Sequence, residues 1–435
     1  MTPRPGKGSL ASSSPYTERA ILGIQMSALL RRAVAGACLL LAVSVSPVSA
    51  EYETPLLPRD PAAMAQGGAA VSAASGYTAL FSNPAGFVGT PGELTVLSAR
   101  GWVHSSPARA LEVARLAASN ASIEPGSSAY ERLERDLRRN GLGVGSSLGV
   151  AYVGRGLGLG LVTTVDGFLY GESFELAAGE VTSELTLIGG WAFPFEIGPA
   201  RLQLGAAGRP LVRVHSLINA EETPDAAPAL VQHVLGVQAP YDGEDYAVLL
   251  NETYYGYGLA IDAGAQLFWN RWSLGLAVRD IGDTSLTYSK TNLREVLDEL
   301  RGRALPSQAE EDEDGYLKPG ARKLPMRGSV GVGYEPSLGG WDDHLDARLQ
   351  LEYDDLFERV NPELPPASRV GAGLEVLVRR RLALRAGLHQ GYLTAGFGLD
   401  LPGFELNAAA FSRETGTDFR DEKSSTVALE LAIRF

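Results

Sequence analysis

The strongest constraint on the fold is an alternation of apolar and polar residues that recurs along most of the chain. At the C-terminus, in SSTVALELAIRF, Val427, Leu429 and Leu431 alternate with Ala428 and Glu430. The same period of two runs through HLDARLQLEYDD, RGSVGVGY and RWSLGLAVRD. Because successive side chains of a strand point to opposite faces, this pattern predicts strands with one apolar and one polar face.

About fourteen segments follow this pattern. They cover residues 93–103, 143–153, 156–170, 180–191, 199–214, 256–268, 271–281, 326–335, 343–353, 368–378, 381–389, 391–400, 403–412 and 424–435. Most are near the length of roughly nine to eleven residues that a tilted membrane strand needs. A soluble β-sandwich would bury the apolar face, whereas a membrane barrel would turn it outward to lipid.

The connections favour the barrel. Brief connections (GR, AFPFEIG, NR, PSLGGWD, RR and PG) alternate with longer ones. The junction HQG is an exception, because it is short where the alternation predicts a longer connection. Three of the longer ones, residues 104–142, 215–255 and 282–325, have about 40 residues each. Outer-membrane barrels combine short periplasmic turns with long extracellular loops. We therefore expect an all-β fold, a transmembrane antiparallel β-barrel of about 14 strands.

Helical patterns interrupt two of the long connections. Residues 108–140 include ARALEVARLAASN and AYERLERDLRRN, and residues 225–236 (DAAPALVQHVLG) form a weaker pattern. Helical segments in long extracellular loops could shape a ligand-binding mouth, or they could simply cap the barrel.

The N-terminus reads as a secretory leader. Residues 26–50 combine Arg31 and Arg32, an apolar run of about 13 residues and the small-residue sequence Val-Ser-Ala ending at Ala50. That run is too short to span a bilayer well. We expect cleavage near Ala50 and localisation in the bacterial outer membrane. Residues 1–25 are interpreted as a mis-assigned start or a disordered preface.

The cysteine content and the net charge exclude further classes of function. Cys38, the single cysteine, lies in the leader, and Ala35 stands where a lipoprotein leader has leucine. Without the preface and leader, which hold five basic residues and one acidic residue, 33 basic and 50 acidic residues remain, a net charge of about −17. A mature chain of this kind offers no disulfide framework and no basic face for nucleic acid.

Motifs for catalysis are not found in the sequence. G-x-S-x-G, H-E-x-x-H and P-loop patterns are missing, and glycine-rich residues 141–149 and 154–160 lack a following helix. The acidic run at residues 307–315 could bind Ca²⁺ or form a solvated loop tip. The histidines show no ligand spacing; they are His104, His215, His233, His344 and His389. We expect no enzyme, no cofactor and no metal site.

Charged residues on the polar faces of the strands are candidates for lining a hydrated lumen. They are Asp262, Arg279, Arg327, Asp346, Arg348, Glu352, Glu375 and Arg385.

Residues 64–87, MAQGGAAVSAASGYTALFSNPAGF, resemble the N-terminal plug of long-chain fatty-acid transporter (FadL-like) outer-membrane barrels and of related PorV-type proteins. The shared residues are Gly67, Gly68, Ala69, Phe81, Asn83, Pro84, Ala85 and Gly86. Residues 382–416 are similar to strands of spirochaete-type members. The resemblance implies a 14-stranded barrel (residues 93–435) whose N-terminal segment (residues 51–92) enters the lumen as a plug, or hatch.

What the resemblance implies about function is the passage of hydrophobic small molecules, such as long-chain fatty acids, across the outer membrane. The partners would be outer-membrane lipid and the hydrophobic ligand. The alternative is a non-transporting scaffold or surface protein, such as a PorV-like secretion adaptor or a surface antigen, that presents its long loops to a partner. Phe435, a terminal aromatic ending an alternating strand, resembles the signal read by the outer-membrane assembly machinery, although it could equally be an ordinary lipid-facing aromatic.

Overall fold

A computed structural model describes residues 51–89, 91–106, 109, 127–219, 252–292, 322–360, 362–414, 416–421 and 423–435. Four expectations lie outside these residues. They concern the preface (1–25), the leader (26–50), the helical pattern at 225–236 and the acidic run at 307–315.

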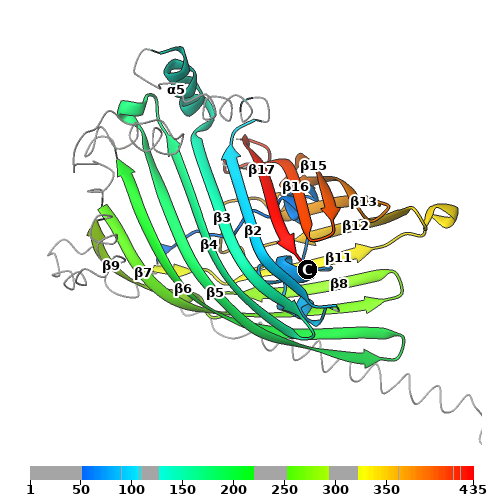
Figure 1. Ribbon diagram of the computed structural model, residues 1–435. Helices are drawn as coiled ribbons and strands as arrows, with labels where there is room; N and C mark the ends of the chain where they lie inside the picture. Colours follow the sequence, from blue (N-terminus) through cyan, green and yellow to red (C-terminus); the bar gives the residue numbers. More distant parts are fainter. Residues whose placement is uncertain are drawn as a thin grey trace, which may run out of the picture. The chain divides into compact units, whose positions relative to one another are not determined.

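The described strands form a closed antiparallel barrel with fourteen strands around its wall (Figure 1). Closure comes from β17, which pairs with β2. The wall consists of β2 (Glu93–His104), β3 (Leu142–Gly154), β4 (Leu157–Tyr170), β5 (Ala178–Ile197), β6 (Ala200–Asn219), β7 (Glu252–Trp269), β8 (Trp272–Arg279), β11 (Arg327–Tyr334), β12 (Leu345–Tyr353), β13 (Val370–Val378), β14 (Leu382–His389), β15 (Tyr392–Leu401), β16 (Phe404–Glu414) and β17 (Lys423–Arg434). The expected fold class is confirmed.

Three further strands occupy or border the region that the sequence assigns to a loop. β9 (Thr284–Asn292) continues the line of β8 along β7, and β10 (Arg322–Leu324) pairs with β9. The N-terminal β1 (Glu51–Tyr52) pairs in parallel with β10. Treating residues 282–325 as a connection is therefore wrong at both ends. The alternation is interrupted because Asp280, Gly282 and Asp283 adopt positive φ.

β5 and β6 are longer than the sequence predicts, with 20 residues each. AFPFEIG is not a connection, because Phe193, Phe195 and Ile197 continue the alternation of β5 and the chain turns only at Gly198. Across the barrel, β12, β13 and β14 have nine, nine and eight residues. One side of the wall is thus about twice as long as the other.

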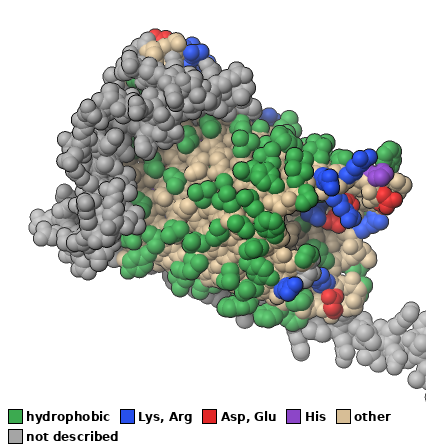
Figure 2. Space-filling view, in the orientation of Figure 1, with side chains coloured by type: hydrophobic (Ala, Val, Ile, Leu, Met, Phe, Trp, Pro, Cys, Tyr) green, Lys and Arg blue, Asp and Glu red, His purple; other side chains and the backbone are tan. Residues whose placement is uncertain are grey.

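The apolar faces of the strands point outward. Large exposed side chains such as Leu161, Leu187 and Leu259 alternate with buried polar groups such as Glu184 and Asp262. Figure 2 shows hydrophobic side chains spread over the outer surface. This arrangement excludes the sandwich and presents the wall to lipid. In the described part of the chain, no helix is long and apolar enough to cross a membrane.

One described helix belongs to the first long connection. α5 (Ser128–Asn140) begins after Ser127, whose hydroxyl accepts from the Tyr130 N–H at 3.1 Å. Its apolar positions Leu133 and Leu137 are buried. The helical pattern expected in the second half of residues 108–140 is confirmed; apart from Arg109, the first half lies outside the described residues.

Candidate functional site

The candidate site is the N-terminal segment, residues 60–88, together with the inner face of the wall. It contains α2 (Pro61–Ala65), α3 (Gly76–Ala79) and the 3-10 helix η1 (Pro84–Val88). α2 packs on β14 to β17, α3 on β2 and β3, and η1 on β3 to β7. The segment therefore touches strands from most of the barrel's circumference.

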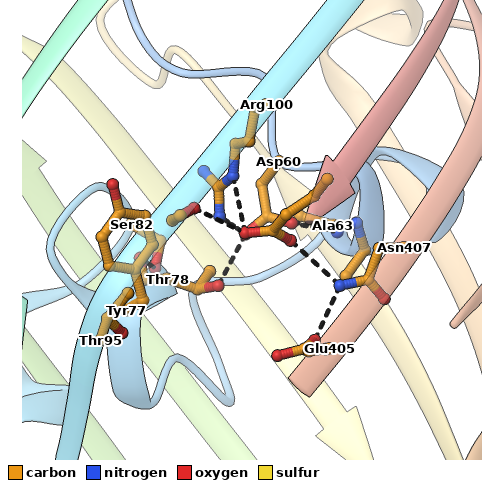
Figure 3. Close-up of polar contacts among 12 residues, drawn as sticks. Asp60, Ala63, Tyr77, Thr78, Ser82, Thr95, Arg100, Glu405 and Asn407 are labelled. Atoms are coloured by element: carbon orange, nitrogen blue, oxygen red, sulfur yellow. Dashed lines mark hydrogen bonds and ion pairs between the residues drawn. The ribbon is translucent and has the colours of Figure 1, made fainter. Parts of the chain in front are cut away.

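Asp60 starts the segment and ties it to the wall. Its Oδ1 accepts from the Ala62 N–H at 2.9 Å, which caps α2, and proline at the first helical position suits this start. Its Oδ2 accepts from Thr78 at 2.6 Å and from Arg100 of β2 at 3.3 Å (Figure 3). Burial alone would raise the pKa of Asp60. The Arg100 guanidinium, the hydrogen bond from Thr78 and the charge of Arg434 together outweigh burial, and the pKa lies below its usual 3.8. Arg100 also binds Glu430 of β17 at 3.0 Å.

Gly67 and Gly68 make the turn after α2 with φ of 70° and 81°. The Gly67 N–H donates to Thr394 of β15 at 3.2 Å, and the Gly67 carbonyl lies 3.1 Å from the His389 ring. A Cβ on Gly67 would collide with the carbonyl oxygens of Leu388 and Ala372. Backbone contact this close to the wall requires glycine.

Asn83 is fully buried and connects the segment to the β7–β8 ladder. Its Nδ2 donates to the carbonyl oxygens of Val71 (3.0 Å), Ala265 (3.1 Å) and Leu276 (3.3 Å). Its Oδ1 accepts from the Ala85 N–H at 3.0 Å and caps η1.

The residues after Asn83 fit against glycines of the wall. Pro84 and Ala85 are buried, and a Cβ on Gly205 of β6 would collide with the Pro84 carbonyl. A Cβ on Gly86 would collide with the carbonyl of Ala74. Phe87 is fully buried against Gly158 of β4. The remaining motif residues are Ala69, which is buried, and Phe81, which packs on the Tyr77 ring at 5.4 Å.

Two further wall residues hold the segment by charge. The Glu352 carboxylate of β12 accepts from the N–H groups of Ala70 (2.7 Å) and Val71 (2.9 Å). Arg279 of β8 donates to the carbonyl oxygen of Phe81. Both residues belong to the predicted lumen-lining set.

The predicted lining residues other than Glu352 occupy four places. Asp262 and Arg279 lie together, with Arg209 between Asp262 (2.5 Å) and Asp280 (2.9 Å). Glu375 and Arg385 form a buried pair at 2.6 Å, and Arg327 lies 3.5 Å from Asp354. Asp346 and Arg348 occupy inward-facing positions of β12 but are more exposed. Near the short turns, Asp346 pairs with Arg380 and Arg348 pairs with Glu335.

The ion-pair partners of these lining residues were not predicted from the sequence. Arg209 and Asp280 are not among the candidates, nor is Arg213, which binds Glu184 at 2.8 Å and Glu53 at 2.9 Å. The strand parity that selected Asp262 also places Arg209 and Arg213 on the inner face, so the same signal could have found them.

A cavity of about 620 Å³ adjoins the segment. Among the described residues, its lining combines charged groups such as Arg59, Asp166 and Arg413 with apolar groups such as Leu57 and Phe81. Arg59 and Asp166, both in its lining, form an ion pair at 3.3 Å. The described residues hold no group of three or more histidine, cysteine, aspartate or glutamate side chains that could bind a metal ion.

Phe435 ends the chain beside the seam that closes the barrel. Its N–H donates to the Leu94 carbonyl at 3.0 Å, and its carbonyl accepts from the Leu94 N–H at 2.8 Å. The ring is 72% exposed.

No family model matches the chain, and no curated protein matches it. Among solved structures it is similar to the toluene transporter TodX of Pseudomonas putida, with 13% identity, coverage of 88% of this chain and 99% of that one, and a TM-score of 0.42. It is also similar to the CymD monoaromatic hydrocarbon channel, with 11% identity, coverage of 88% of this chain and 98% of that one, and a TM-score of 0.45. A FadL homologue of Pseudomonas aeruginosa is 13% identical, with coverage of 88% of this chain and 99% of that one and a TM-score of 0.39.

Proposed function

We propose that the protein is a FadL-like outer-membrane channel that passes hydrophobic small molecules, such as long-chain fatty acids, with residues 51–92 as its plug. The observation that carries the proposal is the seating of residues 60–88 against the inner face of a closed wall, beside a cavity of about 620 Å³. A volume of this size falls in the range of ligand pockets. The resemblance of residues 64–87 to FadL-like plugs supports the same function.

Transport through such a barrel requires the plug to close the lumen to polar solutes while hydrophobic ligands enter the cavity. Apolar side chains that line the cavity provide contacts for the ligand; they include Leu56, Leu57, Met64, Phe81, Phe168 and Phe411. The hydrogen bonds that hold the segment to Glu352, Arg279 and Arg100 would keep it in place between transport events.

The test uses proteoliposomes that contain the full chain or a variant lacking residues 60–88. We expect the full chain to accelerate uptake of a labelled long-chain fatty acid but not of a pentose, and the deletion to raise pentose leakage at least tenfold. Circular dichroism and heat-modifiable migration on gels would show that both barrels are folded.

Unchanged pentose leakage in a folded deletion variant would refute the plug. Fatty-acid uptake no faster than in empty liposomes would refute the channel. If the connections at residues 105–141, 220–251 and 293–321 then captured a stable partner, the scaffold function would replace the channel function.

A further inference from the structure

The short turns carry exposed arginines in backbone conformations that favour other residues. Arg155, between β3 and β4, has φ of 56°, and Arg379 and Arg380, between β13 and β14, have φ of 50° and 54°. Tight turns with two positive φ values are normally built from asparagine, aspartate and glycine. Arginine is thus not the residue that these turns need for their geometry.

Most of these guanidinium groups form no ion pair within the described part of the chain. Arg380 lies 3.3 Å from Asp346, with both side chains largely exposed. For Arg155, Arg379 and Arg381, all exposed, the described residues provide no ion pair. Arg271 lies beside the acids of the β11–β12 connection, where its carbonyl accepts from the Glu335 N–H at 2.9 Å. Exposed acids also lie at this end, in the β11–β12 connection (Glu335, Asp342 and Asp343) and beside the β5–β6 and β15–β16 turns (Glu196 and Asp400).

Aromatic side chains border the arginine turns on the outer surface. Trp269 and Trp272 are paired across the turn that contains Arg271, and both are about half exposed. Trp272 packs on Tyr334 with ring centroids 4.5 Å apart, and Trp191 is 65% exposed on β5. Aromatic residues at the ends of membrane strands lie at the level of the lipid headgroups. Figure 2 shows basic side chains, with acidic ones among them, next to the hydrophobic surface at this end.

We propose that the short-turn end of the barrel binds anionic phospholipid headgroups, with Arg155, Arg379 and Arg381 contacting their phosphates. The occupant follows from two observations: guanidinium groups without an ion pair among the described residues can bind a phosphate, and the adjoining surface is the apolar, aromatic face that contacts acyl chains. An acidic soluble protein would match the charge but not the continuous apolar surface beside it. This inference does not depend on whether the barrel transports a ligand.

The test uses energy transfer from the barrel's own tryptophans to dansyl-labelled lipids in phosphatidylcholine nanodiscs. We expect the full-length protein to enrich dansyl-phosphatidylglycerol at least threefold over dansyl-phosphatidylcholine. The variant R155N/R379N/R381S is expected to lose at least half of this preference. Asparagine accepts positive φ, so the variant's turns remain compatible with the fold. The control R132Q/R135Q alters two exposed arginines of α5 and should keep the preference.

Equal transfer to both lipids in the wild-type protein would overturn the proposal. So would a folded triple variant with unchanged preference. If the wild-type protein showed no lipid preference and the same arginines were needed to retain an acidic soluble protein, the surface would be a protein-docking site instead.

Discussion

The side-chain amide of Asn83 donates a hydrogen bond to the carbonyl oxygen of Ala265, 182 residues further along the chain, at 3.1 Å. Ala265 pairs with Leu276 in the β7–β8 ladder, and the Leu276 carbonyl accepts from the same amide nitrogen at 3.3 Å. One side chain thus joins the N-terminal segment to two wall strands.

We predict that N83A lowers the free energy of unfolding by about 2 kcal/mol, because buried hydrogen bonds are lost. N83D should be worse, since its carboxylate would face three carbonyl oxygens. Urea unfolding in detergent micelles and trypsin cleavage of the N-terminal segment measure both effects. An N83D variant at least as stable as N83A would contradict this account of the contacts.

Gly67 and Gly89 provide a matched pair. G67A should cost about 2 kcal/mol or more, because its backbone is left-handed and a Cβ would meet two wall carbonyls. Gly89 has a φ of −42°, and the nearest atom to its Cβ position is 3.7 Å away, so G89A should be nearly neutral. Thermal unfolding compares the two, and equal midpoints would show that Gly67 is not held against the wall.

The strands could be predicted from the sequence because alternation reports the face of each residue directly. Residues 93–103, for example, are observed as Glu93–His104. β9 was missed because Asp280 and Asp283 break the pattern where the backbone kinks. The alternation shows whether a residue faces inward or outward, but not how far it lies from the ends of the barrel. It selected Asp346 together with Asp262, although only Asp262 is deeply buried.

The partners of the predicted residues required information that alternation does not contain. Arg209 and Asp262 are 53 residues apart and meet because of the register between β6 and β7. Register depends on hydrogen bonding between strands, and several registers preserve the same inward and outward faces. The sequence therefore indicated which residues face inward, but not which of them form pairs.

Asp60 predicts a pH dependence. Its pKa is lower in the folded protein than its usual 3.8, so the charged form contributes stability above that pH and loses it as the pH falls through the folded pKa. D60N keeps a residue that can cap α2 but removes the charge facing Arg100. We expect D60N to be less stable than wild type at pH 7 by about 1–3 kcal/mol.

The difference between wild type and D60N should shrink as the pH is lowered below 3.8. Urea unfolding of both proteins at a series of pH values measures it. A difference that stays constant down to pH 2 would show that the carboxylate charge is not the source of stability.

Phe435 allows the role of its ring to be separated from that of its backbone. Deleting it removes two hydrogen bonds to Leu94 at the barrel seam, whereas F435A keeps them. If the ring is the assembly signal, we expect F435A to lower outer-membrane yield nearly as much as the deletion, and F435W to restore it. Membrane fractionation measures the yield, and a normal yield for F435A would exclude the signal role of the ring.

The unequal strands of the wall have a consequence for the surrounding bilayer. β5 and β6 would span about 66 Å when extended, while a nine-residue strand such as β12 spans about 30 Å. A flat hydrocarbon slab of uniform thickness cannot match both sides of such a barrel. Either β5 and β6 project beyond the slab, or the lipid beside β12, β13 and β14 thins, or the barrel axis tilts, and in the last two cases hydrophobic mismatch bears on the barrel's orientation in the membrane.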